Sequence, residues 1–242
     1  MNGTSPTYAI KVQGLVKGFG EYPVLNGLDL TLDWGRRLTI FGANGSGKTT
    51  LLRLLSTQYR PDGGKIWVGG IERGQSPAAI RGMIGVVAHS PMIYEDLTCE
   101  ENLRFFGRIF GLKGLGPRID QVLGQVGLRQ RADQRARTLS HGMQKRLAIA
   151  RAILHDPPIL LLDEPESGLD AEALEGLRNV IIGGAERSRT VVMATHNVEV
   201  GLAWADEVAV LGDGRIVYRA ERHEVNEAHL RGAYLRRVEV AA

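Results

Sequence analysis

The sequence predicts an α/β fold with an antiparallel β subdomain at the N-terminus and a helical subdomain inserted into the core. The segment "LDLTLDW" alternates apolar and polar residues, which is typical of a half-buried strand paired with an earlier one. Short apolar runs at 83–88, 158–163 and 190–195 lie between helical segments, as expected for parallel strands covered on both faces. Residues 97–155 separate the first two runs, and we expect them to be mostly helical.

Two patterns typical of helix N-termini predict helices inside the inserted region of about 90–155. Thr98, with Glu101 three residues later, forms a capping box. Ser140 lies where the N-cap of a second helix is expected, and Gly142 stands beside it. Such a helix start can hold a phosphate. The apolar stripe of this second helix is Met143, Leu147, Ala150 and Leu154.

The C-terminal part of the chain closes the predicted domain. The segments "DEVAVL" and "RIVYRA" flank "GDG" and predict a hairpin. One domain is therefore expected over 8–220. We interpret residues 221–242, which carry His223, His229 and several arginines, as an exposed C-terminal helix or tail.

Composition and charge exclude several classes of protein. The chain has 242 residues, of which 43% are apolar and 24% charged, as in ordinary globular domains. Its net charge of +3 disfavours a strongly basic nucleic-acid binder, so we expect no nucleic-acid partner. The single cysteine, Cys99, excludes a disulfide within the chain and a cysteine-based zinc site, and we expect a packed thiol.

No membrane-targeting pattern stands out in the sequence. The segment "MNGTSPTYAIKVQGLVKG" lacks the basic start and apolar stretch of a secretory signal. No run approaches the roughly 18 apolar residues of a membrane span. We therefore expect a cytoplasmic protein with no direct membrane insertion, which reaches a membrane only through a partner.

The segment "GANGSGKT" carries the first chemical signal. It matches the pattern G-x-x-x-x-G-K-[ST] through Gly42, Gly47, Lys48 and Thr49. Glycines let backbone N–H groups curl around phosphate oxygens, the lysine adds a charge, and the threonine hydroxyl suits Mg²⁺. A chance glycine turn is disfavoured because the segment follows a predicted strand and opens a predicted helix.

Polar side chains at the ends of two predicted core strands carry the second signal. The strand "PILLLDEP" delivers Asp163 and Glu164 to the carboxyl edge of the sheet, beside the phosphate loop. Asp163 suits Mg²⁺, and Glu164 suits a base that activates water. A strand that merely ends in a polar turn is the alternative. His196 follows the strand "TVVMAT" and reaches the same edge, where a lone histidine is more often structural.

Together these motifs resemble the ATP-binding-cassette (ABC) ATPases, the motor subunits of membrane transporters. The resemblance covers about residues 8–220 and keeps the family's motif order. It implies a P-loop NTPase core of the ABC ATPase fold, with the helical subdomain at about 90–155 inserted. The matching segments are the phosphate loop at 42–49, the signature "LSHGM" at 139–143, the strand "ILLLDE", the loop "SGLD" at 167–170, His196 and the aromatic position Phe19.

The resemblance also implies roles for individual residues. Lys48, His89, Glu164 and His196 are the expected catalytic residues, and Thr49 and Asp163 are the expected Mg²⁺ ligands. The expected cofactors are ATP and Mg²⁺. Contacts to ATP are expected from Phe19, Gly42, Asn44, Gly45, Ser46, Gly47, Lys48, Thr49, Thr50, Ser140, Gly142 and Asp170.

In this family the signature serves the nucleotide of a second subunit. Two subunits meet head to tail, so Ser140 and the Gly142 backbone are expected to contact the terminal phosphate bound to the partner's loop. A homodimer, or a heterodimer with a second ABC ATPase subunit, is therefore implied. ATP binding would close this dimer and hydrolysis would open it.

The chain departs from the family pattern at three positions. Met143 replaces the usual glutamine of the signature, and His141 either adds a donor near the phosphate or is a surface histidine at the dimer seam. His89 stands where the family has a glutamine. Neutral imidazole is a poor ligand for Mg²⁺, so His89 either binds the attacking water or serves only as a hinge. The neighbouring segment "SPMIYEDL" is the expected docking surface for a membrane permease.

The segments "HSPMIYEDLTCEENLRFFGRIFGL" and "AILHDPPILLLDEP" are similar to the haem-exporter ATPases of cytochrome c biogenesis and to other ABC-2 exporter ATPases. We therefore expect the ATP-hydrolysing motor of an exporter, bound through its permease to the inner face of the cell membrane. The alternatives are an importer ATPase and a permease-free ABC ATPase, such as an iron–sulfur assembly factor.

Overall fold

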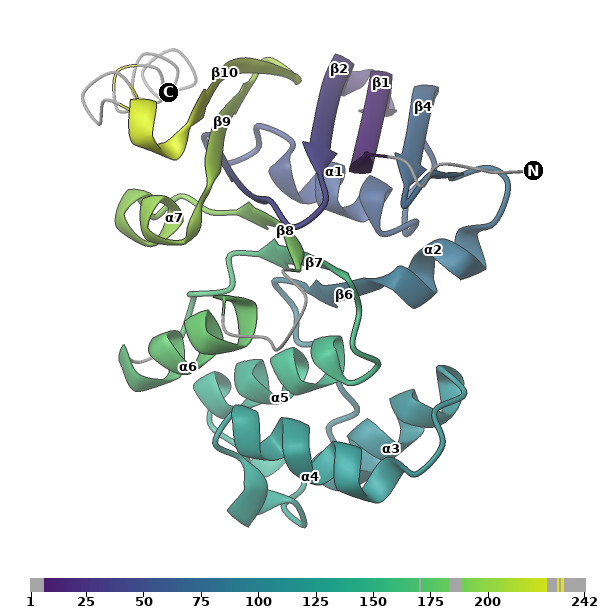
Figure 1. The fold of residues 1–242 in the computed structure, drawn as a ribbon, viewed down its shortest axis with the longest axis vertical. Coiled ribbons are helices and arrows are strands. Elements are labelled where there is room, and N and C mark those ends of the chain that lie inside the picture. Colours follow the sequence, from purple (N-terminus) through teal and green to yellow (C-terminus); the bar gives the residue numbers. More distant parts are fainter. Residues whose placement is uncertain (1–6, 170, 183–188, 226–229, 231, 233–242) are drawn as a thin grey trace.

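Two β-sheets with a helix between them form one half of the fold, and a lobe of helices forms the other (Figure 1). The computed structural model describes residues 7–169, 171–182, 189–225, 230 and 232. In Figure 1 the helices of the lobe gather at the end of the molecule opposite the N-terminal strands. The predicted α/β fold class is confirmed by this arrangement.

The first sheet is antiparallel and has the strand order β2-β1-β4-β5. Its central pairing joins β1 and β2, with Leu28 opposite Leu15. The alternation predicted for "LDLTLDW" is confirmed, because Leu30 is buried and its neighbours Asp29 and Thr31 are exposed. The strands are β1 (Tyr8–Phe19), β2 (Tyr22–Asp33), β4 (Gly63–Val68) and β5 (Ile71–Glu72).

The second sheet has the order β10-β9-β3-β8-β7-β6 and runs parallel from β9 to β6. The three apolar runs of the sequence form its neighbouring strands β8, β7 and β6, as predicted. Their carboxyl ends therefore meet at one edge. The strands are β3 (Arg37–Phe41), β6 (Ile84–Val87), β7 (Ile159–Asp163), β8 (Thr190–Ala194), β9 (Glu207–Gly212) and β10 (Arg215–Glu221).

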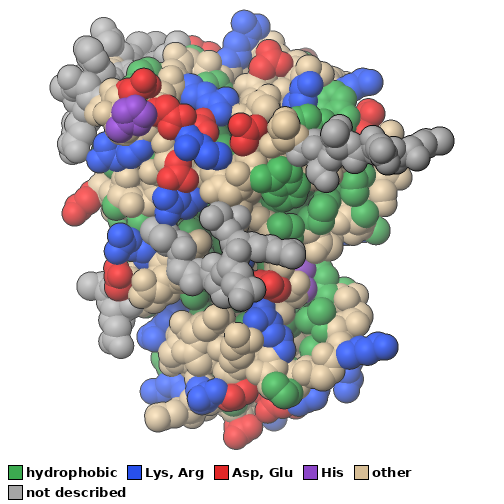
Figure 2. Space-filling view, in the orientation of Figure 1, with side chains coloured by type: hydrophobic (Ala, Val, Ile, Leu, Met, Phe, Trp, Pro, Cys, Tyr) green, Lys and Arg blue, Asp and Glu red, His purple; other side chains and the backbone are tan. Residues whose placement is uncertain are grey.

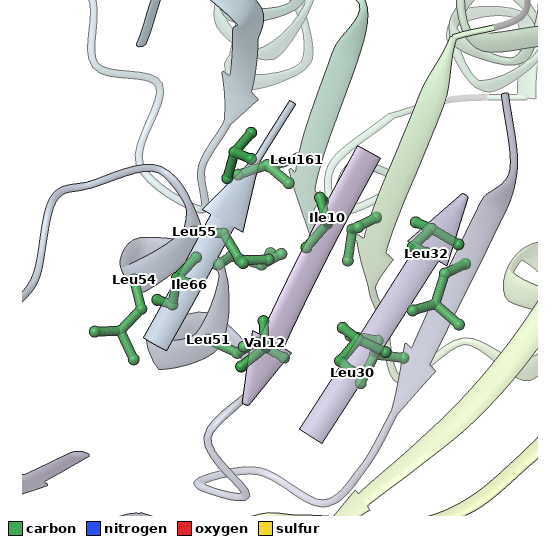
Figure 3. Packing of buried hydrophobic residues seen from close by; sticks show 14 of the residues in the cluster. Ile10, Val12, Leu30, Leu32, Leu51, Leu54, Leu55, Ile66 and Leu161 are labelled. Carbon is green, nitrogen blue, oxygen red and sulfur yellow. The ribbon is translucent and has the colours of Figure 1, made fainter. Parts of the chain in front are cut away.

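Helix α1 (Lys48–Leu55) packs between the two sheets (Figure 3). Figure 3 shows Leu51 and Leu55 of α1 among apolar side chains of β1, β2 and β4. Leu161 of β7 closes this cluster from the second sheet, whereas Leu160 points to the opposite face and packs with the helical lobe. Burial on both faces explains why β7 is apolar at every position before Asp163.

The helical lobe lies between β6 and β7 in the chain. Its first helix starts with the predicted capping box: the Glu101 N–H donates to Thr98 Oγ1 over 3.1 Å, and the Thr98 N–H donates to Glu101 Oε2 over 2.8 Å. Cys99 is buried, as expected for a packed thiol. The helices are α3 (Cys99–Ile109), α4 (Leu115–Gln125) and α5 (His141–Ile153), with short turns at Arg129–Arg131 and Ala136–Thr138.

Shorter helices complete the core. Helix α2 (Pro77–Met83) leads into β6, α6 (Ala171–Ile182) packs on the lobe side of the sheet, and α7 (Val198–Trp204) follows β8. Within the described residues, no helix is both long enough and apolar enough to span a bilayer.

The predicted C-terminal hairpin is formed by β9 and β10, which pair antiparallel. Glu207 of β9 accepts hydrogen bonds from Arg36 over 3.0 Å and from Arg219 over 2.5 Å. Figure 2 shows acidic and basic side chains interspersed over this part of the surface. The segment 221–242 lies mostly outside the described residues, His229 included. Within it, Leu230 is fully buried in a cluster with Phe41, so this position is not the exposed tail that we expected.

Candidate functional site

The phosphate loop lies between β3 and α1, as the motif predicts. Gly47 has a φ of 103°, a backbone conformation that side chains rarely adopt. A Cβ at this position would also lie 2.9 Å from Leu25 Cδ2 of β2. Helix α1 begins at the next residue, Lys48, so its free N–H groups point into the loop. The loop and helix start together form an anion site of the kind that binds phosphate.

Lys48 is buried and its ammonium is fixed to the loop. Its Nζ donates to the carbonyl oxygens of Gly42 (2.6 Å) and Ala43 (3.0 Å). Burial lowers the pKa of Lys48, while the charges of Glu164 and Asp163 oppose this shift. The side chain therefore holds a donor group beside two carboxylates at the end of β7.

Asp163 and Thr49 face one another across the loop. Thr49 Oγ1 lies 3.1 and 2.9 Å from the two carboxylate oxygens of Asp163. Burial raises the pKa of Asp163, and the hydrogen bond from Thr49 opposes this shift. A hydroxyl and a carboxylate in contact offer the oxygen ligands that Mg²⁺ prefers.

Glu164 lies at the junction of three strand ends. Its φ of 46° is left-handed, which is uncommon for a residue with a side chain, and its N–H donates to Ala194 O at the end of β8 over 2.9 Å. This conformation directs the carboxylate to His196, whose Nδ1 lies 3.0 Å from Glu164 Oε1. His89 Nδ1 lies 4.0 Å from Glu164 Oε2, beyond hydrogen-bond distance.

A cavity of about 290 Å³ opens over the loop. Phe19 is 44% exposed at this cavity, and its ring packs edge-on against Tyr59 with centroids 5.5 Å apart. The ammonium of Lys17 lies over the same ring. The residues that line the cavity are Phe19, Val24, Asn44, Gly45, Ser46, Gly47, Lys48, Thr49, Thr50 and Glu164.

The signature residues lie apart from this group. Ser140 caps α5, where its Oγ accepts a hydrogen bond from the Met143 N–H over 3.3 Å. A Cβ at Gly142 would lie 2.8 Å from the carbonyl oxygen of Gly168, so the start of α5 packs against the "SGLD" loop of its own chain. Asp170 of that loop lies outside the described residues. The predicted N-cap is confirmed, and the described residues lining the cavity do not include Ser140 or Gly142.

The oxygen groups at the loop fit a Mg²⁺ ion held together with phosphates. Ser46 Oγ is buried and finds no hydrogen-bond partner among the described residues, which leaves a polar atom for a ligand in the loop. Among the described residues, no group of three or more histidine, cysteine or acidic side chains is placed so that it could hold a metal ion by itself. Mg²⁺ does not need such a cluster, because it binds through one or two carboxylates together with substrate phosphates.

Sequence patterns missed two contributors to this site. Val24 of β2 lines the cavity, although nothing in its strand pattern distinguishes it from other edge residues. Lys145 of α5 donates to the carbonyl oxygen of Glu164, although its sequence context resembles that of an exposed helical lysine. In both cases the contact joins segments that lie far apart in the chain.

A sequence profile described as "ABC transporter" matches residues 25–167, more than half of the chain. The chain belongs to the ABC transporter family. This ABC protein is 35% identical to Nod factor export ATP-binding protein I of Ralstonia nicotianae, over 92% of the chain and 70% of that relative. It is 34% identical to ABC transporter ATP-binding protein NatA of Bacillus subtilis, over 83% of each chain. It is 35% identical to daunorubicin resistance ATP-binding protein DrrA3 of Streptomyces coeruleorubidus, over 90% of the chain and 69% of that relative.

Solved structures show the same fold. The ATP-binding subunit of an ABC transporter superposes with a TM-score of 0.84 at 26% identity, covering 96% of this chain and 98% of that one. A dimeric ATP-binding cassette in a post-hydrolysis state with ADP and Pi superposes with a TM-score of 0.79 at 27% identity, covering 88% and 98%. The ABC protein is therefore an ATPase, and the predicted ABC ATPase fold is confirmed.

Proposed function

We propose that this ABC ATPase is the motor subunit of an ABC-2-type exporter. The site assignment rests on one observation: five polar side chains lie together at one edge of the sheet. They are Lys48, Thr49, Asp163, Glu164 and His196. Support for export comes from the relatives, because the names of two of them describe Nod factor export and daunorubicin resistance.

ATP would occupy the cavity over the phosphate loop. The exposed Phe19 ring lines this cavity and would offer a stacking surface for adenine. Backbone N–H groups of 44–50 and the start of α1 would hold the phosphates, as helix N-termini do for anions. Lys48 would exchange its two carbonyl partners for phosphate oxygens, which moves its charge onto the outer phosphates.

Thr49 and Asp163 would hold Mg²⁺ together with the phosphates. When bound, the ion would supply positive charge that offsets the negative charge of the phosphate oxygens. Asp163 would contribute a carboxylate oxygen, and Thr49 would contribute a hydroxyl oxygen once its hydrogen turns away from Asp163. Both residues sit on rigid elements, β7 and α1, so their oxygen atoms are preorganised.

Glu164 would act as the general base. The water oxygen attacks the terminal phosphorus, its proton passes to Glu164, and the bond to the bridging oxygen breaks so that ADP leaves. His196 Nδ1, 3.0 Å from Glu164 Oε1, would hold the carboxylate in place, and its second ring nitrogen would be free to contact the terminal phosphate. His89 lies too far from Glu164 for a direct hydrogen bond and would act through the water or as a hinge.

A second cassette would complete the site. Ser140 lies at the N-terminus of α5, away from the cavity of its own chain, and its N-cap position leaves helix N–H groups for an external anion. We infer that Ser140 and Gly142 contact the terminal phosphate bound by the partner subunit, with Asp170 at the same seam. The partner is a second copy of this chain or a second ABC ATPase subunit.

A permease would dock beside the loop that follows β6. Met92 and Tyr94 of this loop are exposed, as are Phe105 and Ile109 of α3, and the rings of Tyr94 and Phe105 pack edge-on with centroids 4.9 Å apart. Figure 2 shows apolar side chains on both sides of the notch between the sheet half and the helical lobe. Exposed aromatic clusters of this kind mark protein interaction sites. Docking there would place the protein at the inner face of the cell membrane.

The narrower expectation of haem export and cytochrome c biogenesis gains no support from the relatives, whose names speak of Nod factor export and daunorubicin resistance. We therefore leave the transported substrate to experiment. The single domain expected over 8–220, with its helical subdomain at about 90–155, remains part of the proposal.

The test is capture of the membrane partner by a stalled motor. Tagged Glu164→Gln, loaded with Mg-ATP, is purified from detergent-solubilised membranes of its host, and the bound proteins are identified. We expect a multispanning partner that is lost in the control Glu164→Gln/Tyr94→Asp, which keeps the ATP site. A Soret band in the visible spectrum would support haem as cargo. A soluble partner, or only the dimer of the chain, would contradict the transporter role.

A further inference from the structure

Lys145 of α5 is buried to an extent that is unusual for a lysine. Its side chain is 2% exposed, and it ranks among the largest fully buried side chains of the described chain. Lysines are almost never fully buried unless they are paired. Burial lowers the pKa of the ammonium, while the charges of Asp163, Glu166 and Glu164 oppose this shift. A cation is therefore enclosed directly behind the proposed catalytic edge.

The ammonium of Lys145 contacts two loops of the proposed site. Its Nζ lies 3.3 Å from the carbonyl oxygen of Ala88 and 3.2 Å from that of Glu164. Ala88 immediately precedes His89 in the loop that leads towards the proposed permease surface. Glu164 is the proposed base. One side chain on α5 thus contacts the main chain of both the loop after β6 and the loop after β7.

The contact to Glu164 falls on a strained stretch of backbone. Glu164 is left-handed, with a φ of 46°, a conformation that persists only when its surroundings hold it. Its N–H is held by Ala194 O of β8, and its carbonyl is held by Lys145. With both sides of the residue fixed, the carboxylate is directed to His196 Nδ1 at 3.0 Å.

Glu166 ties the same loop to the loop that carries His196. Its Oε1 accepts a hydrogen bond from Thr195 Oγ1, and Thr195 Oγ1 in turn accepts from the Asn197 N–H over 2.9 Å. The second carboxylate oxygen of Glu166 is buried and finds no partner in the described part of the chain. This buried negative charge offsets the charge of the Lys145 ammonium. The loop after β7 is therefore held by α5 from one side and by the His196 loop from the other.

We propose that Lys145 is a positioning residue for hydrolysis, which holds Glu164 in its left-handed conformation and links the signature helix α5 to the base of its own chain. The inference rests on the proposed role of Glu164. Because Ser140 caps α5, a shift of this helix on contact with the partner's nucleotide pulls on the Glu164 carbonyl through Lys145. Events at one ATP site thereby reach the base at the other.

Lys145→Met tests the proposal because it keeps the length and apolar stem of the side chain but removes the ammonium. We expect the full-length chain to bind ATP with a Kd within about twofold of wild type, because no part of Lys145 lines the cavity. We expect kcat to fall at least tenfold with little change in KM. A purely structural lysine would lower thermal stability and leave kcat of the folded fraction unchanged, which would overturn the proposal.

A double-mutant cycle separates this proposal from the role of Glu164. If Lys145 acts through Glu164, then Lys145→Met lowers the residual rate of Glu164→Gln by less than twofold. A further tenfold loss in that background would show that Lys145 acts on something else, and would overturn the proposal. If Glu164→Gln alone keeps the wild-type rate, the proposed base is wrong, and this result is independent of Lys145.

Two further variants complete the experiment. Lys113→Met changes an exposed lysine in the same lobe, and we expect wild-type kcat and KM. Lys145→Gln keeps an N–H donor in a neutral side chain and serves if Lys145→Met does not fold. We expect Lys145→Gln to bind ATP normally and to have a kcat at least threefold below that of wild type. A glutamine variant that binds ATP and hydrolyses it at the wild-type rate would show that the ammonium is dispensable, against the proposal.

Discussion

The phosphate loop and the N-terminus of α5 both have the geometry of an anion site, but the side chains that surround them in the folded chain differ. Around the loop, Lys48 and Thr49 make hydrogen bonds to the loop carbonyls and to Asp163. At the start of α5, Ser140 only caps its own helix, and none of the described residues that line the cavity belongs to that helix. The phosphate loop thus forms an anion site within the chain, whereas the start of α5 lies outside the cavity over that loop.

The two ends of α5 also differ in how firmly the rest of the chain holds them. At its C-terminal end, Arg118 donates to the carbonyl oxygens of Ile153 (2.6 Å) and Leu154 (2.8 Å), and His155 lies 3.2 Å from Ile84 O. At its N-terminal end, His141 is exposed and packs against Gly168. A helix fixed at one end and exposed at the other can respond at its exposed end to a second subunit. This difference supports the proposal that one half-site is assembled within the chain and that the other, at the start of α5, is completed by a second subunit.

The largest expected effect is on the assembled half-site. Glu164→Gln keeps the shape of the side chain but removes the base, so ATP hydrolysis should fall by about 10²–10⁴-fold while ATP binding is retained. Steady-state phosphate release and nucleotide binding measure the two effects. Size-exclusion chromatography with Mg-ATP should show an accumulated dimer. Glu199→Gln, in the exposed first turn of α7, is the matched control. Hydrolysis at the wild-type rate would refute the assignment of Glu164 as base.

The second prediction tests the exposed half-site. Ser140→Asp preserves the N-cap, because aspartate caps as well as serine, but places a negative charge where the partner's phosphate is expected. Hydrolysis should fall by about 10²-fold and the ATP-dependent dimer should be lost, while each chain still binds ATP. Thr98→Asp makes the same change at the N-cap of α3 and should leave activity unchanged. If Ser140→Asp still forms the dimer, the signature does not face a phosphate across the seam.

The third prediction concerns the fixed end of α5. His155 stacks on Phe110 with centroids 3.9 Å apart, and its burial lowers the pKa to about 4. The unfolded chain therefore binds more protons between about pH 4 and 6.5, so stability is lost as the pH falls through this window. The free energy of unfolding should drop by about 2 kcal/mol between pH 7 and 4.5 from this group alone. Denaturant titrations of wild type and His155→Gln measure the difference.

The exposed His223 provides the matched control for that experiment. His223→Gln should keep the wild-type dependence of stability on pH, whereas His155→Gln should remove about 2 kcal/mol of it. An equal dependence in His155→Gln and wild type would show that His155 does not titrate differently in the folded chain.

The sequence predicted the assembled half-site more completely than the exposed one. Apolar runs such as "ILLL" predicted parallel strands, because a strand that is buried on both faces is apolar at successive positions. These strands bring Asp163 and His196 to one edge of the sheet. No such pattern predicted the left-handed Glu164 or the buried Lys145. Their conformations depend on carbonyl groups from distant segments, which no local pattern reports. Leu230 was unexpected for the same reason, because its burial depends on the cluster around Phe41.

The smallest expected effect lies between the two regions, at His89. This side chain is 73% exposed, and its Nδ1 lies 4.0 Å from Glu164 Oε2, too far for a hydrogen bond. Imidazole is a poor Mg²⁺ ligand, whereas the glutamine usual in the family offers an oxygen. His89→Gln should therefore change kcat by less than about threefold, measured by phosphate release at saturating Mg-ATP. His89→Ala is the matched control, because alanine has neither the imidazole of histidine nor the amide of glutamine. A hundredfold loss in His89→Gln would show that the imidazole contacts the reacting water, so that the assembled half-site extends into the loop towards the helical lobe.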